Sequence, residues 1–127
     1  MDVKQHLAAA YALDRDGDEH GAIKHYDAAW ALGVPADEEK KFLVGYGSTL
    51  RNVGRADHAV AILAAAVEKY PDYPALAAFL GLALADAGHP RAALATLLGV
   101  ILDLEAGRLD GFHRALAEYQ RELLDKG

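Results

Sequence analysis

The side chains in this sequence that could do chemistry are one serine, Ser48, and six histidines. Covalent catalysis needs a nucleophile beside a base, and phosphate binding commonly uses a glycine-rich loop. The sequence has no cysteine, neither GxGxxG nor GxxxxGK[ST] occurs, and no pair of carboxylates has a recognisable catalytic spacing. We therefore expect no catalytic residue and no enzyme activity.

Metal binding is the chemistry that the histidines suggest first. His20 and His25 are five residues apart, about 140° around a helix, so they do not share a face as a metal-binding pair at i and i+4 does. His20, His58 and His89 occupy corresponding turns of the chain. We interpret them as surface turn residues, and we predict no metal site and no cofactor.

Composition describes a single folded domain over residues 1–127. The chain is 53% hydrophobic and 25% charged, which is ordinary for a protein that buries a core. No charge-free apolar run reaches the roughly 18 residues of a membrane span, and the start of the chain lacks the pattern of a secretory signal. A formal net charge of -6 argues against nucleic-acid and membrane partners. We expect a cytoplasmic protein.

A repeat of about 34 residues organises the chain. Gly54 and Gly88 each open a polar turn and are 34 residues apart, and Gly17 precedes Gly54 by 37. Five residues after each glycine comes an alanine, and four residues later a large apolar residue. These pairs are Ala22 and Tyr26, Ala59 and Leu63, and Ala93 and Leu97.

Apolar residues within each unit recur with the period of a helix. Leu43, Tyr46, Gly47 and Leu50 follow the i, i+3/i+4, i+7 pattern of one helical face. Gly47 and, in the next unit, Gly81 are small where two antiparallel helices must cross closely. With prolines as signals for the first helical turn, the pattern predicts helices over residues 3–15, 19–33, 36–52, 56–69, 74–87, 90–105 and 109–126.

This spacing resembles the tetratricopeptide repeat family. The second unit carries its pattern almost completely, at Leu43, Tyr46, Gly47, Leu50, Ala59, Leu63, Ala66 and Pro71. The turn "LRNVGR", the segment "FLGLALADAG" and the ending "EYQREL" resemble those of small bacterial members. The resemblance implies an all-α, right-handed solenoid of three helix pairs (residues 3–35, 36–73 and 74–106). A capping helix over 109–126 follows, and Trp30 is expected in the core.

The resemblance also implies a concave groove, lined by the first helix of each pair, that binds a protein or peptide. The groove positions that the resemblance implies include Leu7, Ala78, Leu82, Ala85 and Gln120. They also hold five cations (Lys4, Arg15, Lys41, Arg51 and Arg121) and three carboxylates (Asp14, Asp86 and Asp110), which favours an anionic ligand. The alternatives are solvated helix faces, a self-assembling homodimer and, less favoured, an enzyme or small-ligand binder. The residues predicted to contact the ligand are Tyr11, Arg15, Ser48, Arg51, Asn52 and Arg121.

Overall fold

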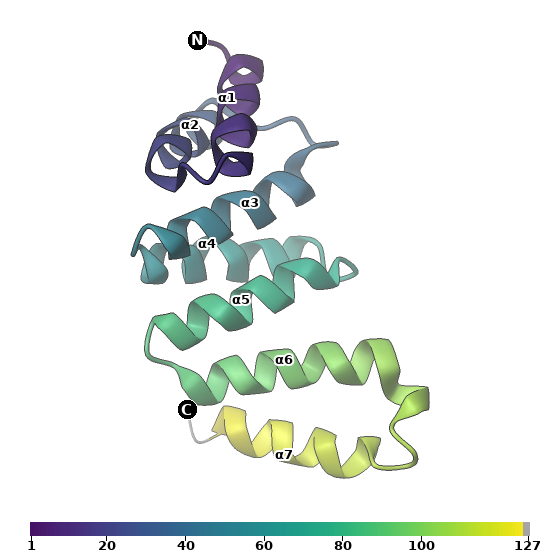
Figure 1. Cartoon of the computed structure of the whole chain (residues 1–127). Helices are drawn as coiled ribbons and strands as arrows, with labels where there is room; N and C mark the ends of the chain where they lie inside the picture. The colour runs from purple at the N-terminus through teal and green to yellow at the C-terminus, as the bar shows by residue number, and fades with distance from the viewer. Residues whose placement is uncertain (126–127) are drawn as a thin grey trace.

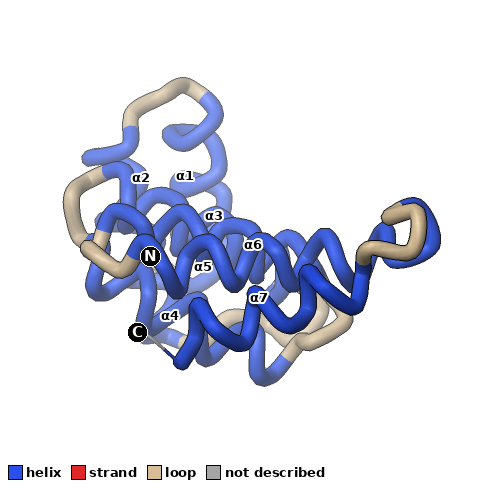
Figure 2. Tube along the Cα trace, turned by 90° about the horizontal axis from the view of Figure 1, so that it is seen from below, coloured by secondary structure: helices blue, strands red, loops and turns tan. Residues whose placement is uncertain are grey.

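The computed structural model describes residues 1–125, except for the side chain of Ala106. These residues form seven α-helices and one short 3-10 helix, joined by short loops (Figure 2). The helices are α1 (Val3–Arg15), α2 (Glu19–Leu32), α3 (Glu39–Asn52), α4 (Ala56–Lys69), α5 (Pro74–Asp86), α6 (Pro90–Glu105), η1 (Ala106–Arg108) and α7 (His113–Asp125).

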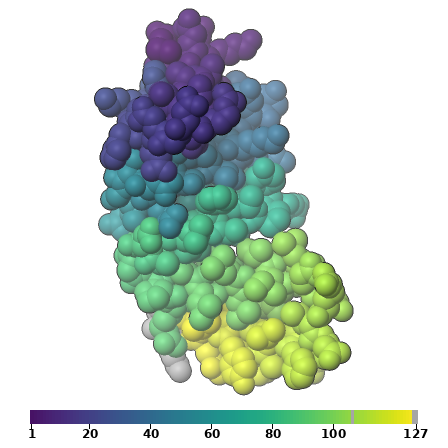
Figure 3. Space-filling view, in the orientation of Figure 1, coloured from purple at the N-terminus to yellow at the C-terminus, as the bar shows by residue number. Residues whose placement is uncertain are grey.

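The helices stack in chain order, with α1 at one end and α7 at the other (Figure 1). Antiparallel neighbours α1 and α2, α3 and α4, and α5 and α6 form three pairs, and α3 also packs against α5. The result is an elongated molecule in which each pair contacts its sequence neighbours (Figure 3). This all-helical stack confirms the predicted fold class.

The same turn closes the first helix of each pair. Gly17, Gly54 and Gly88 have φ angles of 81°, 87° and 90°. Because a side chain is strained in this left-handed region, glycine is the favoured residue there. After Gly54, the amide of Arg55 donates to the carbonyl of Leu50 at 2.8 Å, which satisfies a free carbonyl at the helix end. The repeated glycine is thus a helix stop.

Two glycines allow the paired helices to approach each other closely. A Cβ atom at Gly47 would lie 2.5 Å from Cγ and Cδ2 of Leu63, and one at Gly81 would lie 2.8 Å from Cγ of Leu97. Ordinary contact between carbon atoms is about 3.5–4.0 Å. The sequence prediction that small residues mark the crossing is therefore confirmed at both positions.

Two helix starts differ from the prediction. Helix α3 begins at Glu39 rather than at 36, because residues 35–38 form a separate turn in which the Glu38 amide donates to the Pro35 carbonyl at 3.0 Å. Helix α7 begins at His113 rather than at 109, because Asp110 and Gly111 have positive φ angles of 53° and 84°. Residue 126, the predicted end of that helix, lies outside the described residues.

The core follows the inner faces of the stacked pairs, and its aromatic centre joins the first pair to the second. Phe42 lies 5.5 Å from both Tyr26 and Tyr46, measured between ring centroids. Trp30 stacks on Phe42 at 5.9 Å, yet it is 38% exposed. Trp30 therefore lies at the edge of the core rather than inside it, because it borders an open hollow between α2, α3 and α4.

Candidate peptide-binding groove

The six predicted contact residues are spread along the stack. Tyr11 and Arg15 lie on α1, and Arg121 lies on α7 at the opposite end (Figure 1). Ser48, Arg51 and Asn52 lie on the last turns of α3. Ser48, Arg51 and Asn52 therefore lie close together, whereas Arg121 lies on a different helix at the far end of the stack.

Tyr11 borders a pocket between α1 and the start of α3. The pocket has a volume of about 450 Å³ and is lined by Tyr11, Asp37, Glu38 and Lys41. Burial, followed by the negative charge of Glu38, raises the pKa of the Tyr11 hydroxyl. The phenol therefore stays protonated and can donate a hydrogen bond to a ligand. The sequence interpretation missed the two acids, since "PADEEK" also fits an ordinary helix start.

Arg51 and Asn52 already have partners within the chain. Arg51 Nε donates to Asp86 Oδ2 at 2.7 Å, and Asn52 Nδ2 donates to Glu19 Oε1 at 2.9 Å. Arg51 Nη1 also donates to Asn52 Oδ1 at 3.4 Å. We call the four residues Glu19, Asn52, Arg51 and Asp86 the polar chain. The polar chain links all three helix pairs.

A ligand can still reach Arg51. Its side chain is 28% exposed, and a guanidinium has five N–H donors, of which Asp86 and Asn52 use only two. Ser48 is half-buried and precedes Arg51 by three residues, so the two side chains lie on neighbouring positions of one helical face. Asn52 is exposed. These three residues form a polar cluster at the end of α3.

Other groove positions differ from what the resemblance implied. Leu7 is only 4% exposed and belongs to the core, so it is not available to a ligand. Gln120 on α7 donates to the carbonyl of Ala95 at 3.0 Å and thereby anchors α7 on α6. On α5 the groove positions Ala78, Leu82 and Ala85 are apolar, and Leu82 is 40% exposed. The groove therefore changes from charged to apolar along the stack.

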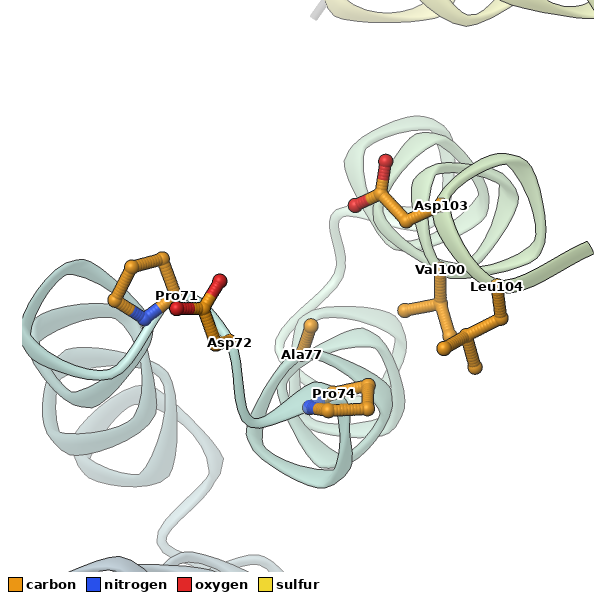
Figure 4. Close-up of a pocket in the computed structure, with 7 residues that line it drawn as sticks. All are labelled: Pro71, Asp72, Pro74, Ala77, Val100, Asp103 and Leu104. Atoms are coloured by element: carbon orange, nitrogen blue, oxygen red, sulfur yellow. The ribbon is translucent and has the colours of Figure 1, made fainter. Parts of the chain in front are cut away.

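A second hollow lies between the start of α5 and the end of α6. It has a volume of about 280 Å³. Asp72 and Ala77 lie on one side of it, and Val100, Asp103 and Leu104 lie on the other (Figure 4). The sequence did not predict this hollow, because its walls come from the loop before α5, from α5 and from α6, whose packing is not apparent in the chain.

Two buried tyrosines donate to carboxylates, one within the first helix pair and one between the first and second pairs. Tyr26 donates to Asp14 at 2.6 Å and Tyr46 donates to Asp27 at 2.5 Å. Burial, together with the hydrogen bond and charge of the carboxylate in each case, raises both tyrosine pKa values. Burial opposes ionisation of Asp27, but hydrogen bonds from Arg55 and Tyr46 outweigh it and lower the Asp27 pKa. These contacts join α1, which carries Tyr11, to α2, and α2 to α3.

The tyrosine shifts predict a loss of stability in alkali. Because the folded state holds the Tyr26 and Tyr46 protons more tightly than the unfolded state, the stability that they supply is present below about pH 10 and falls as the pH rises further. We expect two of the six tyrosines to ionise only as the helices melt. Absorbance at the tyrosinate band and circular dichroism, recorded on one sample, check this.

The Tyr46→Phe variant provides the control for that titration. It removes one of the two delayed ionisations, so a single tyrosine should remain coupled to unfolding. Ionisation of all tyrosines before any loss of helix signal in the wild type would contradict the buried placement of Tyr26 and Tyr46.

Stacked antiparallel helix pairs with a glycine at the turn inside each pair define a helical-repeat solenoid. A sequence model of the family described as Tetratrico peptide repeat matches residues 4–123. The chain belongs to this family. Comparison with curated proteins and with solved structures found no match. Members of the family generally bind protein partners and are not catalysts.

Two further observations bear on the kinds of ligand considered. Within residues 1–125, no helix is both long and apolar enough to cross a membrane. Groups of three or more histidine, cysteine or acidic residues arranged to hold a metal ion do not occur in that part of the chain.

Proposed function

We propose that the protein is a non-catalytic interaction module that binds a segment of a partner protein in its concave groove. The proposal rests on the change from charged to apolar side chains along the groove. Lys4, Arg15 and Lys41 are exposed, and no ion pair occupies them among the described residues. The α5 positions that follow are apolar. The groove therefore suits a segment with a carboxylate-bearing end and an apolar end.

The contact residues proposed for this segment are Tyr11, Arg15, Ser48, Arg51, Asn52 and Arg121. Arg51 lies where the charged and apolar parts meet, with donors left over from its pair with Asp86. Arginine offers planar paired donors to a carboxylate, and charge-assisted hydrogen bonds are stronger than neutral ones. Arg121, on a helix that packs on α6, contacts only a segment long enough to reach the end of the stack.

Peptide selection tests the proposal. A display library of random peptides is selected against the protein, and the affinity of a selected peptide is then measured by fluorescence anisotropy. We expect acidic peptides with an apolar stretch, and we expect Lys41→Ala with Arg51→Ala to weaken binding at least tenfold. Such a loss corresponds to about 1.4 kcal/mol.

A lysine on the second helix of the first pair provides the matched control. Lys24 is exposed on α2, so Lys24→Ala removes one positive charge away from the groove and is the match for Lys41→Ala alone. Equal affinity of Lys24→Ala and the double variant would contradict binding in the groove. Circular dichroism of each variant confirms that the helices remain, since Arg51 also belongs to the polar chain.

Self-association is the second candidate function. Phe112 and Tyr119 are 65% and 57% exposed on and beside α7, at one end of the stack. Exposed aromatic residues are enriched at protein interfaces. A molar mass from light scattering that stays that of one chain at all concentrations would exclude this candidate.

A further inference from the structure

Two histidines that are far apart in the sequence meet between the first two helices. His6 on α1 and His25 on α2 approach with their Nδ1 atoms 3.0 Å apart. Their ring centroids are separated by 5.2 Å and the ring planes are inclined by 44°. Both residues are half-buried, so solvent reaches the pair. Sequence analysis compared His25 with His20 on the same helix and missed this pair.

The distance between these two nitrogens suits a shared metal ion. A histidine nitrogen binds such an ion at about 2.0–2.1 Å. Two nitrogens at a right angle are then about 2.9 Å apart, and two at a tetrahedral angle are about 3.4 Å apart. The observed 3.0 Å lies between these values. To bind one ion, both rings must turn so that their Nδ1 lone pairs leave the line between the two nitrogens and point to a common position.

The surroundings of the pair also favour binding. The two Nδ1 atoms form a hydrogen bond with each other, so one ring donates and the other accepts. Neither ring takes part in an ion pair within residues 1–125. An ion therefore displaces one hydrogen bond and no charged partner, and the donor ring moves its proton from Nδ1 to Nε2 as the ion binds. Because α1 and α2 pack directly against each other, the two ligands are already positioned, which reduces the entropy lost on binding.

We propose that His6 and His25 form a two-histidine site for a divalent late first-row transition metal, with Cu²⁺ bound most tightly. Imidazole nitrogen suits Cu²⁺, Ni²⁺ and Zn²⁺, and affinity for a given site generally peaks at Cu²⁺. Water fills the other coordination positions. The ion joins α1 to α2 and thereby stabilises the first helix pair. This role is separate from peptide binding in the groove.

The first test uses the wild-type protein with Cu²⁺ as the probe. Electron paramagnetic resonance at one equivalent of Cu²⁺ should show coupling to two imidazole nitrogens. A signal that shows one nitrogen or none would overturn the proposal. This measurement does not depend on any variant being folded.

The second test compares three histidine variants by calorimetric titration with Cu²⁺. We expect His6→Gln and His25→Gln each to weaken binding of the first equivalent at least tenfold. His20→Gln should bind as the wild type does, because His20 is exposed on the same helix as His25. Equal affinities in all three variants would show binding by scattered surface histidines and would overturn the proposal.

Discussion

Replacing Phe42 with alanine should lower the free energy of unfolding by about 3–5 kcal/mol, the usual cost of truncating a buried aromatic residue. Phe42 is 0% exposed, and its ring lies within 6 Å of the rings of Tyr26, Trp30 and Tyr46, at centroid distances of 5.5, 5.9 and 5.5 Å. The substitution therefore opens a cavity at the junction of the first two helix pairs. Urea denaturation followed by circular dichroism measures the loss.

Phe112→Ala is the matched control, because it removes the same atoms from a side chain that is 65% exposed. We expect its free energy of unfolding to stay within about 0.5 kcal/mol of the wild-type value. Comparable losses in the two variants would contradict the placement of Phe42 at the centre of the core.

The Gly47→Ala substitution should destabilise the protein as well, because it overfills the core instead of leaving a cavity. The new Cβ atom would lie 2.5 Å from Cγ and Cδ2 of Leu63, which is itself fully buried and cannot move aside. Overpacking costs about 1–3 kcal/mol, whereas the higher helix propensity of alanine returns up to about 1 kcal/mol. We expect a net loss, measured by urea denaturation.

A double-mutant cycle with Leu63→Ala makes this prediction specific. Leu63→Ala alone costs about 2–5 kcal/mol, but it removes the atoms that the new methyl group meets. In that background Gly47→Ala should therefore stabilise the protein, by up to about 1 kcal/mol. Gly107→Ala, where a Cβ atom meets nothing within 4 Å, controls for the change of residue type. If Gly47→Ala still lowers the free energy of unfolding in the Leu63→Ala background, the steric explanation is refuted.

Much of the fold could be predicted because its signals are local. The glycine stop, the alanine five residues later and the helical period all lie within one repeat, and α1, α4 and α6 match their predicted bounds. The start of α7 was predicted four residues too early because of Asp110, whose φ of 53° is unusual for a residue with a side chain. The exposure of Trp30 depends on how far one pair overlaps the next, which no single repeat encodes.

The polar details of the groove could not be predicted for the same reason. Arg51 and Asp86 are 35 residues apart, and Asn52 and Glu19 are 33 apart. Their pairing requires the register between successive helix pairs, and a one-turn shift would separate them by about 5.4 Å. The sequence predicted that Arg51 and Asn52 lie at the end of α3, but it could not show which partners they meet.

The polar chain also reaches across both junctions between successive helix pairs. Arg51 connects α3 to Asp86 at the end of α5, and Asn52 connects α3 back to Glu19 at the start of α2. The two junctions between the helix pairs are therefore bridged by one continuous side-chain network, in addition to the packing of the helices themselves.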